Sequence, residues 1–295
     1  MSVAVVGASG VVGPAVVASV AARDPSVKAL VRRPEAVDAA RAAGAKVAVG
    51  ELDDVATLEA VLRGSETVCH LVGGVNEPDE HAYDASSRAS AERVVQVATR
   101  VGVRRILLLS AFGAAPESPN PFLRAKGRAE HLVATSGLEY SVLRTAPIYG
   151  PGGFWFTATV LLAELDPPAI VGEPSRPVTP VFVDDVAAAL AAMDDRQTPV
   201  EGPLTLSGPH RVTAAELGRM ISGRPDVRSL DPMQARTTLS DLLGRPVAPA
   251  ALELLAAPVV PDPRLRDAAE LLGIAMTPLR EGLARVASHI GPHAG

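Results

Sequence analysis

The 295-residue chain is poor in aromatic residues and in cysteine, and each shortage excludes a class of protein. Aromatic residues make up 3% of the chain, which leaves few rings to stack on nucleic-acid bases. The formal net charge is −5, whereas nucleic-acid-binding domains usually have a basic surface. The single cysteine, Cys69, excludes an intramolecular disulfide bond, and no group of His, Asp and Glu has metal-ligand spacing. We therefore expect a small-molecule partner, no nucleic-acid partner and no metal site.

Long apolar runs are also lacking. None approaches the ~18 residues that cross a membrane, and the first residues show neither the basic nor the apolar region of a secretion signal. The sequence therefore predicts a soluble, cytoplasmic protein without a membrane partner, as a monomer or homodimer. With 47% hydrophobic residues, a chain of this length can bury a large core.

The chain does contain a regular alternation of short apolar runs and amphipathic stretches over residues 1–145. This alternation is typical of βαβ units, and strands that are apolar throughout indicate a parallel sheet covered on both faces. We predict an α/β fold, a Rossmann-type doubly wound parallel sheet with a smaller, mostly helical C-terminal substrate lobe. The expected strands are Ser2–Val6, Ser26–Val31, Val47–Val49, Thr67–Val72, Arg104–Leu109 and Glu139–Arg144, and the expected helices are Val11–Arg23, Asp54–Leu62, Ser86–Val101 and Pro121–Thr135.

After Gly150 the pattern changes. Five prolines between Asp166 and Pro180 indicate a surface excursion, and the later helices are expected to be shorter. The predicted division is a nucleotide-binding domain, residues 1–150 rejoined by about 178–200, and a substrate-binding lobe, residues 151–177 and 201–295. Expected elements here are a strand at Val181–Val183, helices at Phe154–Leu165, Val186–Met193, Ala215–Ile221 and Pro278–Ile290, and N-caps at Asp184 and Thr213.

A glycine-rich turn, Gly7-Ala8-Ser9-Gly10-Val11-Val12-Gly13, joins the first expected strand to the first helix. In this context Gly7 permits a tight turn, Gly10 lets a pyrophosphate approach the main chain, and Gly13 lets the helix pack closely on the strand. Free N–H groups at a helix start bind anions. The turn predicts a dinucleotide site, with contacts from Gly7, Ser9, Gly10, Val11, Val12 and Gly13.

The second expected strand ends in Val31-Arg32-Arg33-Pro34, with no acidic residue at its tip. An acidic residue there would bind the ribose 2′-hydroxyl of NAD, whereas an arginine accommodates the 2′-phosphate of NADP. Arg32 and Arg33 therefore predict NADPH as the cofactor.

These motifs and several later stretches resemble the short-chain dehydrogenase/reductase superfamily. The resemblance is to its extended and atypical branches, and nearest to NAD(P)-binding proteins of the NmrA-like and complex-I-accessory-subunit-like kind. It covers nearly the full chain, closely to about residue 195 and loosely afterwards. The stretches that carry it are GASGVVG (7–13), VRRP (31–34), ELDDVATLEAVLRGSETV (51–68), HLVGG (70–74), VGVRRILLLSAFGA (101–114), SPNPFLRAKGRAEHLVATSGLEYSVLRTAPIYGPGG (118–153), PVFVDDVAAAL (180–190) and TPLREGLARV (277–286).

The resemblance implies a role for individual residues. Lys126 matches the family lysine, which hydrogen-bonds the nicotinamide ribose and lowers the pKa of a neighbouring catalytic tyrosine. Ser87 falls where many relatives have a helix asparagine. The other implied cofactor contacts are Leu52 and Asp53 at the adenine, Leu71, Val72 and Gly73 along the ribose, and Pro147 and Ile148 beside the carboxamide.

The chain departs from the family at the catalytic tyrosine, because Phe122 stands four residues before Lys126. The i, i+4 spacing puts both side chains on one helix face, but the phenol oxygen is absent. The family's catalytic hydroxyl on the fifth strand falls at Phe112, with Ser110 two residues before it. Lys126 and Ser110 remain as candidate catalytic residues.

Loss of a positioned general acid costs about 10²–10⁴-fold in rate, so an enzyme of this kind needs another proton source. We predict an NADPH-dependent ketoreductase that transfers hydride to a carbonyl of a bulky, aromatic polyketide-like substrate, with the proton supplied by substrate or water. The Ala-, Gly- and Pro-rich composition is typical of GC-rich genomes, in which antibiotic polyketide pathways are common. The candidate substrate contacts are Phe112, Phe122, Tyr149, Phe154 and Trp155.

Two other functions fit the same residues. One is an NADP(H)-binding redox sensor or assembly protein without catalysis, which needs the cofactor site but no acid. The other is a reductase like the plant ether and isoflavone reductases, in which a lysine without the tyrosine serves as base. Tyr83, Tyr149 and His81 are alternative proton donors, His70 is expected to be structural, and Arg104 and Arg105 are expected to be a solvated strand start.

Overall fold

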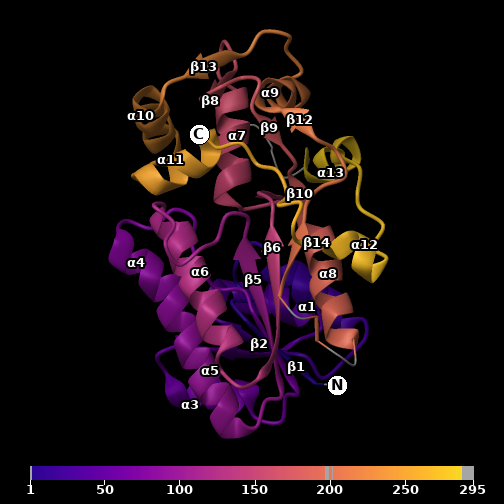
Figure 1. Ribbon diagram of the computed structural model, residues 1–295. Helices are drawn as coiled ribbons and strands as arrows, with labels where there is room; N and C mark the ends of the chain where they lie inside the picture. Colours follow the sequence, from indigo (N-terminus) through magenta and orange to yellow (C-terminus); the bar gives the residue numbers. More distant parts are fainter. Residues whose placement is uncertain (1, 197–198, 201, 288–295) are drawn as a thin grey trace.

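The computed structural model describes residues 2–196, 199–200 and 202–287. Its centre is an eight-stranded sheet in the order β14-β11-β6-β5-β4-β1-β2-β3 (Figure 1), and every neighbouring pair in it is parallel. The strands are β1 (Val3–Val6), β2 (Lys28–Val31), β3 (Lys46–Val49), β4 (Thr67–His70), β5 (Arg105–Ala111), β6 (Glu139–Thr145), β11 (Pro203–Leu206) and β14 (Arg266–Asp267). The predicted doubly wound Rossmann sheet is confirmed.

Helices cover both faces of this sheet because side chains of each strand point alternately to either side. Val3 and Val5 of β1 join the core under α1 and α8, whereas Ala4 and Val6 join the core under α3, α5 and α6. The helices of these two layers are α1 (Gly13–Ala21) and α8 (Val183–Asp195), then α3 (Val55–Leu62), α5 (Ser90–Val101) and α6 (Pro121–Ala134). A short helix, α2 (Val37–Ala42), follows the 3₁₀ turn Pro34–Ala36 between β2 and β3.

The helix expected at Ser86–Val101 is longer than the sequence indicates. It begins with α4 (Glu80–Asp84), continues through a π-helical turn at Ala85–Ala89, and runs into α5. Asp79 caps its start, because the carboxylate accepts a hydrogen bond from Ala82 N. Single π-helical turns often mark functional sites, and this one carries Ser87.

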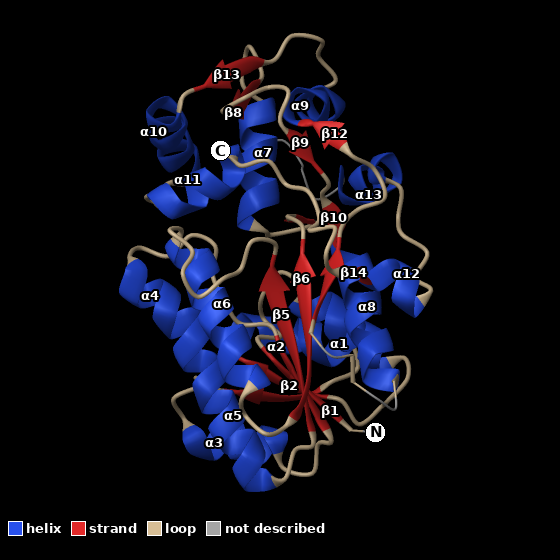
Figure 2. Cartoon of the chain, in the orientation of Figure 1, coloured by secondary structure: helices blue, strands red, loops and turns tan. Residues whose placement is uncertain are grey.

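A second lobe lies beyond the carboxyl ends of the strands, where the arrowheads of β5 and β6 point (Figure 2). Thr213 caps α9 with a full capping box, as predicted. Among the described helices, none combines the length and hydropathy needed to span a bilayer. The remaining elements are β7 (Ile148–Tyr149), α7 (Phe154–Ala163), β8 (Ala169–Val171), β9 (Pro177–Val178), β10 (Val181–Phe182), β12 (Val212–Thr213), α9 (Ala214–Ser222), β13 (Arg228–Leu230), α10 (Pro232–Leu243), α11 (Pro249–Ala256), α12 (Ala268–Leu272) and α13 (Leu279–Val286).

The predicted division into domains needs correction, because residues 201–295 do not form the lobe alone. β11 pairs with β6 and β14 pairs with β11, so both extend the central sheet. β14 is two charged residues long and has no apolar pattern, and only main-chain pairing with a distant strand makes it part of the sheet.

The proline-rich segment 166–180 is not a surface excursion. Ala169–Val171 is fully buried as β8 and pairs with β13, and Val178 is buried in β9. Pro177 is the first residue of β9, a position that proline tolerates, and the other four prolines lie outside β8 and β9.

Two further expectations are wrong at charged residues. Asp184 is not an N-cap, because α8 begins at Val183, one residue before Asp184, and Phe182 occupies the cap position. Arg105 is not solvated: its side chain is fully buried, contacts the Glu139 carboxylate and donates to the carbonyls of Asp194 (3.0 Å) and Arg196 (2.7 Å). It therefore ties β5 to β6 and to the end of α8.

Two asparagines hold the lobe against the sheet. Asn76 donates to Pro246 O (3.1 Å) and accepts from Ala248 N (2.7 Å), so it pairs with the loop before α11. Asn120 caps α6 and donates to Ala250 O (3.0 Å) on α11. These side-chain bonds fix α11 beside the amino end of α6.

Helix α13 closes the other side of the lobe through a glycine contact. The predicted helix Pro278–Ile290 is present at Leu279–Val286, and residues 288–290 lie outside the described part. A Cβ atom at Gly282 would lie 2.0 Å from the hydroxyl oxygen of Tyr149, so the helix packs directly on the ring edge. Asp185 anchors the preceding segment by accepting from Thr277 N (2.9 Å) and Oγ1 (2.7 Å).

Gly282→Ala should therefore destabilise the protein. The added methyl group forces α13 or Tyr149 to move, and overpacking of this kind costs about 1–3 kcal/mol. Urea unfolding would measure the loss, with Ala284→Ser on the exposed face of the same helix as the control. Equal stability of Gly282→Ala and wild type would show that α13 is not docked in this way.

Candidate functional site

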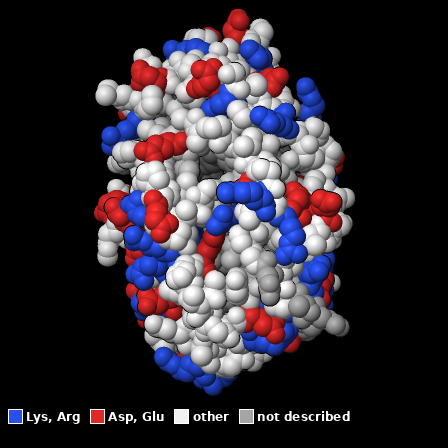
Figure 3. All heavy atoms as spheres, in the orientation of Figure 1, with Lys and Arg blue, Asp and Glu red and all other residues white. Residues whose placement is uncertain are grey.

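The candidate site lies at the carboxyl edge of the parallel sheet. The chain leaves β1 toward β2 and β3 on one side, and β4 follows β1 on the other, so the strand order reverses between β1 and β4. In open α/β sheets this reversal opens a crevice outside the strand ends, where ligands bind. The space-filling view shows this face hollowed where the lobe meets the strand ends (Figure 3).

The glycine-rich turn has the geometry that the sequence predicts. Gly7 has a φ of +88°, a conformation that favours glycine, and Gly10 N donates to Gly7 O (2.9 Å). A Cβ at Gly13 would lie 2.2 Å from Ala8 O, so only glycine lets α1 start this close to the turn. No side chain caps α1 and no acidic residue lies in its first turn. Gly13 N donates to Gly10 O (3.3 Å) and Pro14 has no N–H, so the N–H groups of Val11 and Val12 are the ones that could bind a pyrophosphate.

Arg32 and Arg33 lie beside this turn. Arg33 Nη2 donates to Ser9 O (3.1 Å), Arg32 N donates to Ser9 Oγ (3.5 Å), and both side chains are exposed. The turn and the end of β2 thus form one surface with two cations. This arrangement fits the 2′-phosphate of NADP.

At the expected adenine end, Leu52 is half-buried and Asp53 is exposed. The Asp53 carboxylate forms an ion pair with Arg93 of α5, at 2.9 Å. Arg93 could not be predicted from the sequence, since 40 residues separate it from Asp53 and no local spacing connects the two.

Lys126 of α6 is buried, with 4% of its surface exposed, and reaches the ends of two strands. Its Nζ donates to Val72 O and to Leu109 O, both at 3.0 Å. An ammonium group has three protons, so one remains for a ligand. Burial lowers the pKa of Lys126 to about 8, although the nearby Glu130 carboxylate opposes this shift. The Lys126 side chain therefore changes between its charged and neutral forms close to neutral pH.

Gly73 and Ser87 complete the surroundings of Lys126. A Cβ at Gly73 would lie 2.5 Å from Lys126 Nζ and 3.0 Å from Ser87 Oγ, so the missing side chain leaves room beside both. Ser87 is buried, and its hydroxyl has no partner among the described residues. Val72, Gly73 and Lys126 thus come together at one point, as the resemblance implies.

His70 lies behind this point as a structural residue. It is fully buried, and its Nε2 contacts Ser90 Oγ at 3.2 Å. Burial and the charge of Lys126 lower the pKa of His70 to about 3, which keeps the ring neutral. It adds no second positive charge beside Lys126.

Ser110 is buried, and its hydroxyl is engaged by another side chain. Its hydroxyl donates to Glu130, and Glu130 also pairs with Arg144 of β6. Since Ser110 is 3% exposed and its hydroxyl is engaged, it belongs to a buried polar cluster that joins β5, α6 and β6. The catalytic role of Ser110 stays a prediction, and it would require the hydroxyl to leave Glu130. Glu130 follows Lys126 by four residues, and that spacing is the signal that could have revealed the cluster.

Phe122 occupies the helix face of the expected tyrosine, within an apolar cluster. Its ring packs edge-on against Tyr83, with centroids 6.2 Å apart, and Ala125 and Ala250 complete the cluster. The hydroxyl of Tyr83 donates to Val75 O (2.8 Å), so it is already engaged. His81 is exposed on α4.

The five candidate substrate contacts differ in exposure. Phe112 and Phe154 are half-buried and remain candidates, as do the buried Phe122 and Trp155, whose indole N–H has no partner among the described residues. Tyr149 is a core residue instead: it is 1% exposed and packs between Phe156 and Phe182. Its neighbours come from α7, β10 and α13, which the local sequence does not reveal.

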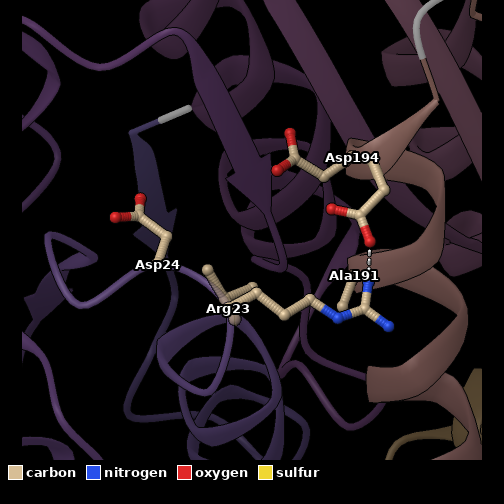
Figure 4. Close-up of a pocket in the computed structure, with 6 residues that line it drawn as sticks. Arg23, Asp24, Ala191 and Asp194 are labelled. Atoms are coloured by element: carbon tan, nitrogen blue, oxygen red, sulfur yellow. Dashed lines mark hydrogen bonds and ion pairs between the residues drawn. The ribbon is translucent and has the colours of Figure 1, made fainter.

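A separate pocket lies at the opposite, amino edge of the sheet (Figure 4). Arg23 extends across it from the end of α1 and pairs with Asp195 at the end of α8. Asp24 accepts from Ser26 N (2.9 Å) and Oγ (2.6 Å). Ligands of parallel sheets bind at the carboxyl edge, so this pocket is not the cofactor site.

A glycine turn at the switch point of a parallel sheet, with two arginines beside it, defines a dinucleotide-binding Rossmann protein. Residues 7–153 match the NAD(P)H-binding family. A 3-diazoavenalumate denitrifying reductase from Streptomyces sp is 35% identical over 231 residues, which cover 67% of this chain and 74% of that protein. The chain belongs to the NAD(P)H-binding family.

The matched fraction of the other relatives varies. An NAD(P)H azoreductase from Xenophilus azovorans is 29% identical, over 75% of this chain and 74% of that protein. A mitochondrial NADH dehydrogenase (ubiquinone) 1 alpha subcomplex subunit 9 from Arabidopsis thaliana is 28% identical over 57% of this chain, and the match spans 42% of that protein. The triphenylmethane reductase of Citrobacter sp., solved with NADP(H), has the same fold, with a TM-score of 0.77, 21% identity and coverage of 97% and 99%.

The depressed pKa of Lys126 can be measured directly, because the chain contains three lysines. With ¹³Cε-labelled lysine, the NMR resonance that disappears in Lys126→Met should titrate with a midpoint near pH 8. Below that pH the side chain is charged, and above it the proton is lost. A midpoint near that of free lysine, about 10.4, would instead show that the ammonium is hydrated.

Proposed function

We propose that this protein is an NADPH-dependent reductase that transfers hydride to a carbonyl of a bulky, conjugated aromatic substrate. The observation that carries the proposal is the ordered Lys126, with a proton free to bind a ligand, beside Phe122 where the family has its tyrosine. The names of the azoreductase and of the diazo-compound reductase, which refer to conjugated acceptors, support a substrate of this kind.

The cofactor choice follows from charge. When bound, NADPH supplies the hydride, and its 2′-phosphate would lie against Arg32 and Arg33. The N–H groups of Val11 and Val12 would bind the pyrophosphate, and Lys126 would hydrogen-bond the nicotinamide ribose. Pro147 and Ile148, both half-buried, would border the carboxamide.

The proton comes from the substrate or from water. A carbonyl flanked by a phenol or quinol hydroxyl can take that hydroxyl proton as hydride reaches its carbon, so no protein acid is needed. Aromatic polyketides include such substrates. The charge of Lys126 stabilises the developing oxyanion from a buried site, where electrostatic interactions are stronger than in water.

Turnover on matched ketones tests the proton source. NADPH oxidation should be fast with quinones and with aryl ketones that carry a neighbouring hydroxyl, and slow with ketones that lack it. Phe122→Tyr restores a phenol next to Lys126, and should raise the rate on ketones without the hydroxyl by about tenfold or more. Lys126→Met should lower the rate on all substrates.

The outcomes separate the proposal from its alternatives. NADPH binding without turnover on the whole panel would favour a sensor or assembly protein. Equal rates with and without the neighbouring hydroxyl would contradict substrate-supplied protonation. A requirement for Lys126 in its neutral form would favour a lysine base, as in ether and isoflavone reductases.

Arg33→Ala tests the cofactor. Removal of this cation should weaken NADPH binding by about tenfold and leave NADH binding unchanged, because NADH lacks the 2′-phosphate. Isothermal titration would measure both affinities. Arg41→Ala, an exposed arginine on α2, is the control. Equal losses for both cofactors would assign Arg33 a purely structural role.

A further inference from the structure

Arg176 differs from the other charged residues of the lobe. The segment before β9 places its guanidinium half-buried, and no carboxylate of the described residues forms an ion pair with it. Nε donates to Val171 O and Nη1 to Ala257 O, each at 3.3 Å, which is longer than a typical bond. Nη2 has no partner among the described residues, so most of the five donors of the fork are free.

The charge of Arg176 is uncompensated as well. Burial lowers its pKa to about 10, with no opposing contribution from a nearby acid. In contrast, Arg88 and Arg264 have raised pKa values because carboxylates pair with them. A desolvated cation without a counter-charge is costly, and a bound anion would remove that cost.

Helix α11 relates Arg176 to the reacting position. Ala250, at the start of α11, belongs to the cluster around Phe122, while Ala257, just after its end, accepts from Arg176. Seven residues of helix separate these points, a rise of about 10 Å. On the other side, β9 and β10 connect Arg176 to Val181, which pairs with Ile148 beside the expected nicotinamide. Figure 1 shows α11 above the end of α6, and β10 above the end of β6.

We propose that Arg176 binds a carboxylate on the aromatic substrate, at the end of α11 opposite the cluster around Phe122. The inference rests on the proposed function for the identity of that substrate, but not for the binding itself. A planar guanidinium fork matches a carboxylate with two parallel bonds. A single arginine without a second cation balances one negative charge, which favours a carboxylate over a dianionic phosphate.

Binding of non-reducible ligands tests the subsite without turnover. Isothermal titration of the NADP⁺-loaded protein would compare 2-naphthoate, the neutral 2-naphthamide and 2-naphthyl phosphate. Naphthoate should bind about tenfold or more tightly than naphthamide. Arg176→Gln should abolish that preference and leave naphthamide binding within about twofold, and Arg176→Lys should retain part of it. Arg245→Gln, at an exposed arginine of the same lobe, should change neither.

Several results would overturn the proposal. One is a wild type that binds neither aryl ligand at millimolar concentration or shows no preference for the carboxylate. Another is an Arg176→Gln variant that melts earlier and loses both ligands equally, which would make Arg176 only a brace for the end of α11. A preference for the phosphate would assign the subsite to phosphorylated ligands instead.

A turnover arm keeps the two proposals apart. Naphthoquinones with and without a carboxylate would be compared as acceptors of electrons from NADPH. If neither is reduced while naphthoate binding depends on Arg176, the proposed function fails and the subsite remains. If both are reduced at equal KM in wild type and Arg176→Gln, the reductase function stands and the subsite is refuted.

Discussion

The buried ammonium group of Lys126 constrains the arrangement of the elements around it. A charge in this position needs polar partners, and the carbonyls of Val72 and Leu109 at the ends of β4 and β5 supply them. The helix can come this close because Gly127 has no side chain: a Cβ there would lie 2.2 Å from the carbonyl carbon of Ala115. The loop after β5 therefore lies directly on α6, next to the lysine.

The cluster of Ser110, Glu130 and Arg144 supports the same helix from the other side. Glu130 is the acid that partly offsets the effect of burial on Lys126, and Arg144 in turn neutralises Glu130. The surroundings of Lys126 therefore depend on contacts among three elements, β5, β6 and α6. In the proposed reductase, the remaining proton of this rigid cation would hydrogen-bond the cofactor ribose, and its charge would stabilise an oxyanion.

The lobe is attached to the same helix. Asn120 caps α6 and bonds to α11, and Phe122, on the first turn, packs against Ala250 of α11. The Phe122 ring thus contributes an apolar contact between the lobe and the sheet, and it carries no acidic group. Arg176 contacts the other end of α11, so one helix joins the cluster around Phe122 to the proposed carboxylate subsite.

Most of the sheet and the phosphate turn could be predicted from the sequence, because they depend on neighbouring residues. Alternating apolar runs, the positive φ at Gly7 and the close packing at Gly13 are all local requirements. The presence of Lys126 and the absence of the tyrosine four residues before it were equally visible.

Tertiary structure alone decided the rest, because the deciding contacts join residues far apart in the chain. β14 joins the sheet only by pairing with β11. Tyr149, predicted as a substrate contact, lies in the core, where Gly282 of α13 packs against its ring. Arg105 is buried only because Glu139 and two carbonyls after α8 surround it. Burial and hydrogen-bond partners are properties of the folded surroundings, and a residue's sequence neighbours do not specify them.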